Sequence, residues 1–152
     1  SAVGRHLAKL LHLEFIDSDE EIESRTGVDI PFIFEKEGEE GFRKREFKVI
    51  DDLSQKDGVV LATGGGAIED STSRSRLGAR GYVVYLYTSV RQQLERTQRG
   101  RIRPKLANGD PEEVLDALMQ LRDPLYREIA DLIVDTDGRR VQTVAREIHE
   151  SL

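Results

Sequence analysis

Two carboxylates stand two residues apart, where we expect a strand to end. The segment Leu13–Asp19 reads Leu-Glu-Phe-Ile-Asp-Ser-Asp, which favours a short strand. Alternate side chains of an extended backbone share a face, so Asp17 and Asp19 are expected to point into one crevice. Paired acids there can hold the water shell of a metal ion and accept a hydrogen bond from a substrate hydroxyl. Alternatively, Asp17 or Ser18 caps the following helix, and both uses are compatible.

Three consecutive glycines follow a second apolar segment. Residues 59–68 read Val-Val-Leu-Ala-Thr-Gly-Gly-Gly-Ala-Ile. A short apolar run bounded by glycines is typical of a buried strand in a parallel sheet. Gly64, Gly65 and Gly66 lack a Cβ, so their backbone can approach a ligand closely and point amide groups at it. A glycine-rich loop alone is a weak motif, and a flexible turn is the alternative.

Arginines cluster between Arg91 and Arg103 and again at Arg139 and Arg140. The formal net charge of the chain is -6, which argues against generic affinity for nucleic acid. A locally basic patch on an acidic protein suits a small anionic ligand. The alternative for any single arginine is a solvated, charged surface.

Strands that alternate with helices predict a parallel, layered α/β sheet. Besides the two segments above, we expect strands at 82–87 and 132–135. Helices are expected from about residue 2, from 19–21, on either side of Gly38, and at 70–79, 89–97, 112–122 and 141–152. Asp123 and Pro124 are expected to interrupt the helix that begins at Glu112, and a further helix then runs to about Ala130.

Length and composition indicate one domain of ordinary soluble character. The chain has 152 residues, of which 38% are hydrophobic, and no apolar stretch long enough to span a bilayer is visible. We see no signal peptide, and the absence of cysteine excludes a disulfide framework. These features fit a cytoplasmic protein with no membrane partner.

The first residues predict an amphipathic helix with no strand before it. Val3, Leu7, Leu10 and Leu11 recur at helical spacing. A helix that begins at the first residue is expected to leave its N-terminal amides uncapped, and such an end is a natural anion site. Ser1 could be the last residue of a phosphate loop, whose Ser or Thr reaches magnesium.

The polar segment 99–111 is broken by two glycines and two prolines. A loop of this length with little regular structure is uncommon unless it works as a lid, so we favour a lid over plain disorder. On closure its arginines would arrive over the site.

Eight short patterns, taken together, carry a resemblance to a known family. In chain order they are Ser-Ala-Val-Gly-Arg, Phe-Ile-Asp-Ser-Asp, Arg-Thr-Gly, Gly-Glu-Glu-Gly-Phe-Arg, Leu-Ala-Thr-Gly-Gly-Gly, Val-Val-Tyr-Leu, Arg-Pro and Arg-Asp-Pro-Leu-Tyr. The chain resembles the shikimate kinase family over residues 1–152. Each pattern is weak alone, but eight in register make the match specific.

The resemblance implies a P-loop fold like that of the nucleoside-monophosphate kinases, with a three-layer architecture and a parallel sheet ordered 2-3-1-4-5. It implies transfer of the γ-phosphoryl group of ATP to the 3-hydroxyl of shikimate, with Mg2+. It also implies a single kinase domain over 1–152, with an acceptor-binding region at about 19–50 and a lid at about 98–111. We further expect a cytoplasmic monomer without nucleic-acid partners.

On the acceptor side, the resemblance implies that Asp19 binds the shikimate hydroxyls and serves as the base. Arg43 and Arg122 would hold the shikimate carboxylate, and Gly65 would lend its backbone amide. A planar guanidinium can grip a carboxylate through two parallel hydrogen bonds, so two arginines suit a small carboxylic acid better than lysines would.

On the nucleotide side, the resemblance implies six residues with different tasks. Ser1 would be a magnesium ligand and Asp17 would lie near the waters of the magnesium, while Ala2 and Arg103 would meet the phosphates. Arg96 and Arg139 would line the adenine.

Two departures from the family pattern accompany the match. The Gly-x-x-x-x-Gly-Lys of the phosphate loop and the strand before it are missing, which would leave a gap with unpaired backbone groups in the middle of the sheet. We therefore expect about a dozen or more further N-terminal residues ending in Gly-Lys, and no kinase activity without them. The second departure is Lys105, where the family usually has leucine; we hypothesise that it adds charge near ATP.

Two alternatives stay open at this point. A related kinase of the same fold, such as a gluconate kinase, would give no reason for a carboxylate pocket made by Arg43, Gly65 and Arg122. A non-catalytic module that kept the acceptor pocket would bind shikimate without ATP turnover.

Overall fold

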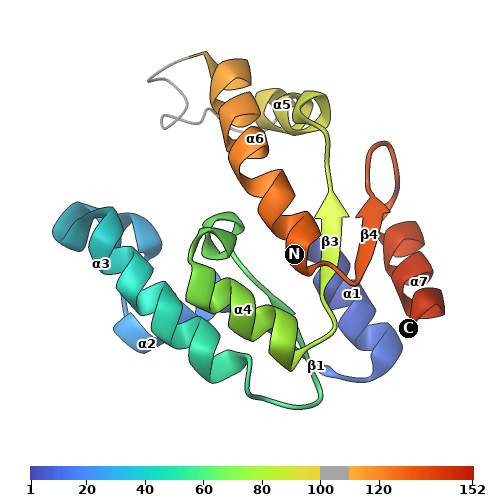
Figure 1. Cartoon of the computed structure of the whole chain (residues 1–152), viewed down its shortest axis with the longest axis horizontal. Helices are drawn as coiled ribbons and strands as arrows, with labels where there is room; N and C mark the ends of the chain where they lie inside the picture. The colour runs from blue at the N-terminus through green and yellow to red at the C-terminus, as the bar shows by residue number, and fades with distance from the viewer. Residues whose placement is uncertain (100–109) are drawn as a thin grey trace.

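The structure is a computed structural model that describes residues 1–99 and 110–152, and it is an α/β fold with parallel strands (Figure 1). Its elements, in chain order, are α1 (Ala2–Leu11), β1 (Glu14–Asp17), α2 (Ser18–Thr26), α3 (Ile30–Leu53), β2 (Val59–Ala62), the 3-10 helix η1 (Gly65–Glu69), α4 (Ser71–Arg80), β3 (Val84–Tyr87), α5 (Val90–Arg99), α6 (Pro111–Ile129), β4 (Leu132–Asp135) and α7 (Val141–Ser151). The alternation of strands and helices predicted from the sequence is therefore confirmed.

The described strands form two separate parallel pairs. β1 pairs with β2 from Glu14 opposite Val59 onward, and β3 pairs with β4 from Val84 opposite Leu132 onward. In the predicted order 2-3-1-4-5, strand 1 is the missing strand before the phosphate loop, so β1, β2, β3 and β4 correspond to strands 2, 3, 4 and 5. The two observed pairs are therefore the outer pairs, 2-3 and 4-5, of that order. In the part of the chain that the structure describes, no strand joins the two pairs.

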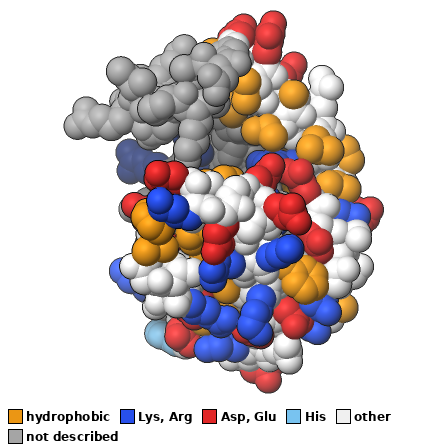
Figure 2. All heavy atoms as spheres, turned by 90° about the vertical axis from the view of Figure 1, so that its left-hand side faces the viewer, with side chains coloured by type: hydrophobic (Ala, Val, Ile, Leu, Met, Phe, Trp, Pro, Cys, Tyr) orange, Lys and Arg blue, Asp and Glu red, His pale blue; other side chains and the backbone are white. Residues whose placement is uncertain are grey.

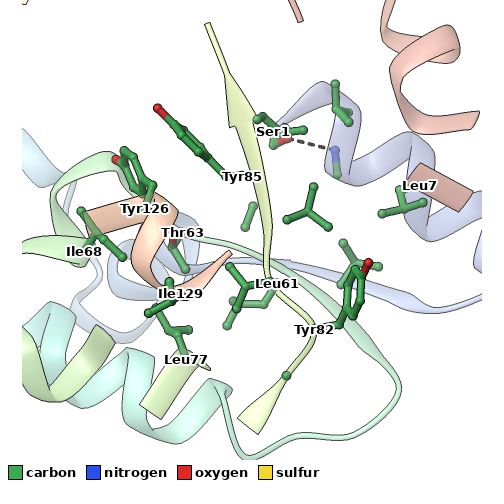
Figure 3. Close-up of a pocket in the computed structure, with 18 of the residues that line it drawn as sticks. Ser1, Leu7, Leu61, Thr63, Ile68, Leu77, Tyr82, Tyr85, Tyr126 and Ile129 are labelled. Atoms are coloured by element: carbon green, nitrogen blue, oxygen red, sulfur yellow. Dashed lines mark hydrogen bonds between the residues drawn. The ribbon is translucent and has the colours of Figure 1, made fainter. Parts of the chain in front are cut away.

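A cavity of about 900 Å³ is lined by β2 on one side and β3 on the other (Figure 3). Leu61 of β2, Leu77 of α4 and Ile129 of α6 contribute apolar side chains to its wall. The gap that we predicted in the middle of the sheet is present.

Apolar side chains pack in two clusters. One lies where α1 and α7 cover β4, with Leu7, Val134, Val144, Ala145 and Ile148 buried. The other lies between α2 and α3, with Ile22, Ile33, Phe42, Val49 and Leu53 buried. The first cluster also packs against Val60 of β2 and Leu86 of β3, so it contacts both strand pairs.

Helix α3 carries a break at Gly38, as predicted. Gly38 has φ 73° and ψ −178°, a conformation that is essentially restricted to glycine. Asp29 caps the start of the helix by accepting a hydrogen bond from the Phe32 N–H at 2.9 Å, and Pro31 lies in its first turn. The break separates the first two turns of α3 from the part that carries Arg43.

Strand β1 ends two residues earlier than predicted. The Asp17 carboxylate accepts hydrogen bonds from the N–H groups of Asp19, at 2.8 Å, and Glu20, at 3.2 Å. This N-cap starts α2 at Ser18, so Asp19 lies on a helix and not on the extended strand that we expected.

The N-terminal amides of α1 are not all uncapped, contrary to the prediction. The Ser1 hydroxyl accepts a hydrogen bond from the Gly4 N–H at 2.9 Å. Sequence reasoning treated Ser1 only as a phosphate-loop residue and overlooked that a serine at this position caps a helix.

The predicted interruption at Asp123 and Pro124 is wrong, because α6 is one helix from Pro111 to Ile129 with Pro124 inside it. Pro124 removes one helical hydrogen bond. Side chains on both sides of it are tied to other elements: Tyr85 of β3 donates a hydrogen bond to Asp123 at 2.6 Å, and Tyr126 donates one to the Gly65 carbonyl at 2.5 Å. These contacts hold the helix together through the proline.

None of the helices at 1–99 and 110–152 is both long and apolar enough to cross a membrane.

Candidate active site

The glycine triplet lies directly after β2 and faces side chains from three different helices. A Cβ built on Gly64 would meet the Asp19 carboxylate of α2 at 2.9 Å, and one built on Gly65 would meet the Arg122 guanidinium of α6 at 3.1 Å. One built on Gly66 would clash with the Arg43 guanidinium of α3. The four residues predicted for the acceptor side, Asp19, Arg43, Gly65 and Arg122, are therefore brought together. Close approach, and not flexibility, explains the glycines.

Asp19 contributes a carboxylate with one unused oxygen. Its Oδ1 atom is buried and has no hydrogen-bond partner among the described residues. Burial raises the pKa of the Asp19 carboxyl, the negative charges of Asp17 and Glu23 raise it further, and Arg43 partly offsets this. A buried oxygen that lacks a donor is suited to accept a hydrogen bond, and then a proton, from a ligand hydroxyl.

Arg43 is held by a buried acid on the same helix. Its Nη1 donates to the Glu46 carboxylate at 2.8 Å, and Glu46 is only 4% exposed. Burial raises the pKa of Glu46, while the hydrogen bond from Arg43 acts in the opposite direction. Sequence reasoning missed Glu46, although its i+3 spacing from Arg43 on a predicted helix was a usable signal.

Helix α6 contributes two residues one turn apart. Arg122 donates from Nε to the Glu69 carboxylate at 2.8 Å, at the end of η1. The Tyr126 hydroxyl donates to the Gly65 carbonyl at 2.5 Å, and the ring lies on the η1 side of the cavity (Figure 3). Neither Glu69 nor Tyr126 was singled out from the sequence, because both contacts join segments more than 50 residues apart.

Ser1 and Asp17 lie next to each other at the start of α1 and α2. The Ser1 nitrogen is 3.7 Å from the Asp17 carboxylate, and Ala2 begins α1. Both side chains offer oxygen atoms, the ligands that Mg2+ prefers. Within residues 1–99 and 110–152, no group of three or more His, Cys, Asp or Glu side chains could hold a metal ion by itself.

Two further nucleotide-side residues, Arg96 and Arg139, follow β3 and β4, Arg96 on α5 and Arg139 in the loop before α7. Arg139 donates to the Asp135 carbonyl at 2.9 Å and to the Glu147 carboxylate at 2.6 Å. The Gly138 N–H donates to Gln92 of α5 at 3.3 Å, so the loop of Arg139 lies beside the helix that carries the exposed Arg96. Arg103 and Lys105 lie outside the described residues.

Positive and negative side chains are interspersed on the side of the molecule that carries α2 and α3 (Figure 2). Many of them are paired, as Arg25 is with Asp52 at 2.7 Å and Arg45 with Glu37 at 2.8 Å. This face thus carries mixed charge rather than one uniform basic surface.

Comparison with known proteins gives one consistent result. A family model described as shikimate kinase matches residues 1–152. A curated shikimate kinase from Shewanella oneidensis is 57% identical over all 152 residues, which cover 89% of that relative. Shikimate kinases from two other Shewanella strains, including Shewanella putrefaciens, match equally well.

Solved structures agree with the sequence comparison. The shikimate kinase from Acinetobacter baumannii, solved in complex with shikimate, superposes with a TM-score of 0.91 at 52% identity, over 98% of this chain and 83% of that one. The enzyme from Aquifex aeolicus superposes with a TM-score of 0.86 at 36% identity, over 99% of this chain and 88% of that one.

Proposed function

The chain belongs to the shikimate kinase family, and from this premise we propose which of its residues carry the reaction. The activity is transfer of the γ-phosphoryl group of ATP to the 3-hydroxyl of shikimate, which yields shikimate 3-phosphate and ADP. The reaction belongs to aromatic amino acid biosynthesis.

The acceptor site is made by Asp19, Arg43, Gly65 and Arg122. The observation that carries this assignment is the meeting of three charged side chains from α2, α3 and α6 on one glycine triplet. Arg43 and Arg122 grip the carboxylate of shikimate, each able to use two parallel hydrogen bonds. The exposed Gly65 offers its amide to the bound acid.

Asp19 is the base. As the 3-hydroxyl oxygen forms its bond to the γ-phosphorus, the bond from that phosphorus to the ADP oxygen breaks, and the hydroxyl proton moves to the Asp19 carboxylate. The raised pKa of Asp19 supports this role, because it brings a carboxylate closer to the pH at which it works. Phosphoryl transfer otherwise needs alignment and charge neutralisation, which the arginines supply.

Ser1, Ala2, Asp17, Arg96, Arg103 and Arg139 serve the nucleotide. Ser1 and Asp17 would hold Mg2+: the two residues are neighbours, with the Ser1 nitrogen 3.7 Å from the Asp17 carboxylate, and both carry the oxygen ligands that suit an ion which keeps several of its waters. When bound, Mg2+ neutralises phosphate charge. Ala2 and Arg103 contact the phosphates, and Arg96 and Arg139 line the adenine.

The domain organisation and the cellular setting complete the proposal. Residues 1–152 form one kinase domain, with the acceptor-binding region at about 19–50 and the lid at about 98–111. The protein works as a cytoplasmic monomer. Light scattering of the purified full-length protein tests the oligomeric state.

The decisive experiment is an assay of ADP release by the full-length protein with and without shikimate. We expect release to depend on shikimate and to be absent with gluconate. A panel of hydroxy acids separates shikimate from other acceptors. Shikimate binding in calorimetry without ATP binding or turnover would instead support a binding module and overturn the proposal.

The arginine assignments are tested by Arg122→Lys. A lysine keeps the charge but loses the planar fork, so KM for shikimate should rise about tenfold or more while KM for ATP stays the same. Arg45→Lys, at an exposed ion pair on α3, is the matched control and should change neither constant. An unchanged KM for shikimate in Arg122→Lys would remove this residue from the site, and the acceptor site as proposed would fail.

A further inference from the structure

The motif Arg-Asp-Pro-Leu-Tyr contains one polar side chain that touches the acceptor loop and has no assigned task. Tyr126 lies one turn after Arg122 on α6, and its hydroxyl donates a hydrogen bond of 2.5 Å to the Gly65 carbonyl. A Cβ on Gly65 would lie 3.6 Å from this hydroxyl and 3.1 Å from Arg122. The side chains of Arg122 and Tyr126, both on α6, therefore lie against the same glycine.

The peptide groups of the triplet need such support. A glycine populates far more backbone conformations than other residues, so a peptide group between two glycines can rotate at little steric cost. Gly64 is held by its own partners, since its N–H donates to the Ser18 hydroxyl at 3.3 Å and its carbonyl accepts from the Ala67 N–H at 3.2 Å. The Tyr126 bond holds the next carbonyl, that of Gly65.

The direction of that carbonyl matters because the peptide unit is planar and trans. The carbonyl of Gly65 and the N–H of Gly66 lie in one plane and point in opposite directions, so fixing the first fixes the second. Rotation of this plane would exchange a donor for an acceptor beside the proposed carboxylate pocket. An acceptor there would repel the oxygen atoms of an anionic substrate.

The helix that carries Tyr126 is itself anchored. Tyr85 of β3 donates to the Asp123 carboxylate at 2.6 Å, and the Tyr85 and Tyr126 rings pack with centroids 4.7 Å apart. Figure 3 shows both rings at the same end of the cavity. Burial raises the pKa of the Tyr126 hydroxyl, which keeps it a donor at neutral pH.

We propose that Tyr126 is a positioning residue for shikimate binding: by binding the Gly65 carbonyl, its hydroxyl fixes the peptide plane between Gly65 and Gly66 so that this carbonyl faces away from the acceptor, which the N–H of the same glycine is proposed to bind. This role rests on the proposed acceptor site. It leaves the nucleotide side untouched, because the Tyr126 hydroxyl binds the loop after β2 and the ring packs on Tyr85 of β3, neither of which is assigned to the nucleotide.

The test is Tyr126→Phe in the full-length enzyme, which removes the donor and keeps the ring. We expect KM for shikimate, and its Kd from calorimetry, to rise about fivefold to tenfold, the worth of one hydrogen bond. KM for ATP and kcat should change less than twofold, and the Tm should fall by no more than about 4 °C, the effect of one lost hydrogen bond. Tyr82→Phe is the matched control, because Tyr82 is 52% exposed and lies at the opposite end of the cavity.

Two further measurements separate the possible outcomes. A crystal structure of Tyr126→Phe should show the Gly65–Gly66 peptide rotated or in two orientations, and a single unrotated peptide would overturn the inference. If Tyr126→Phe leaves the shikimate constants unchanged while Arg122→Lys raises them, the inference fails and the acceptor site stands. If Arg122→Lys also leaves them unchanged, the acceptor site itself fails.

Discussion

The unpaired oxygen of Asp19, the proposed base, lowers the stability of the folded state. Its Oδ1 is buried without a donor among the described residues, and burial raises the pKa of the carboxyl above its ordinary 3.8. A carboxyl whose pKa is raised in the folded state is disfavoured there in its charged form. The protein should therefore gain stability as the pH falls through that pKa, and it carries the cost at neutral pH.

Asp19→Asn removes the charge and should stabilise the protein at pH 7. We expect a gain on the order of 1 kcal/mol, since the site is only half-buried, and thus a rise in Tm of about 2–4 °C. The difference should shrink as the pH falls toward 3.8. The same change should lower kcat by about a hundredfold or more, because the base is lost. Thermal unfolding between pH 4 and 8 measures the first effect, and a variant less stable than the wild type at pH 7 would contradict it.

The site residues that were predicted from the sequence differ from those that were missed, because the contacts of the missed residues join positions far apart along the chain. Asp19 was a candidate from its spacing to Asp17, and Arg43 and Arg122 were identified through the family resemblance; the structure brings all three together. Glu69 and Tyr126 were missed, because a hydrogen bond between residues 53 or 61 positions apart leaves no local pattern.

Among the elements, α3 depends most on a single backbone conformation. Gly38 has φ 73° and lies between the part of the helix with Phe32 and Phe34 and the part with Arg43. Nothing lies within 4 Å of a Cβ added there, so space does not explain the glycine. Its dihedral angles do.

Gly38→Ala should destabilise the protein by about 1–3 kcal/mol, because this backbone conformation is strained for a residue with a Cβ. The Tm should fall by about 2–4 °C for each kcal/mol. Gly81→Ala is the matched control: its φ is −157° and its Cβ would also meet nothing, so its effect should stay within about 0.5 kcal/mol. Equal unfolding temperatures for the two variants, in circular dichroism melts, would show that the break in α3 is not held by the glycine.

Local signals predicted most elements, and tertiary contacts decided the exceptions. The strand 132–135 and the capped helix after Asp70 follow from apolar runs and caps that the chain carries locally. Pro124 is a local helix breaker, yet α6 continues because Asp123 and Tyr126 are bound to β3 and to Gly65. Likewise, the early end of β1 reflects competition between extending a strand and capping a helix at Asp17.

For the molecule as a whole, a cavity lies between the two strand pairs. It measures about 900 Å³, and β2 and β3 border it with apolar side chains such as Leu61. The described pairings leave the facing edges of β2 and β3 without a neighbouring strand. Unpaired backbone groups and exposed apolar surface at such edges favour dye binding and self-association.

We expect the polypeptide of residues 1–152, prepared by itself, to bind the dye ANS and to associate at high concentration. A version extended before Ser1 by a strand and a Gly-Lys turn should bind less dye, because the strand would pair with β2 and β3 and cover the cavity. It should also unfold at a higher temperature, since each Å² of apolar surface that the strand buries contributes about 25 cal/mol before the entropy of ordering the strand is subtracted. ANS fluorescence, light scattering and thermal unfolding of the two polypeptides measure these effects side by side. Equal dye binding and equal Tm would mean that the cavity closes without an added strand. This result would contradict a first strand at the centre of the sheet order 2-3-1-4-5.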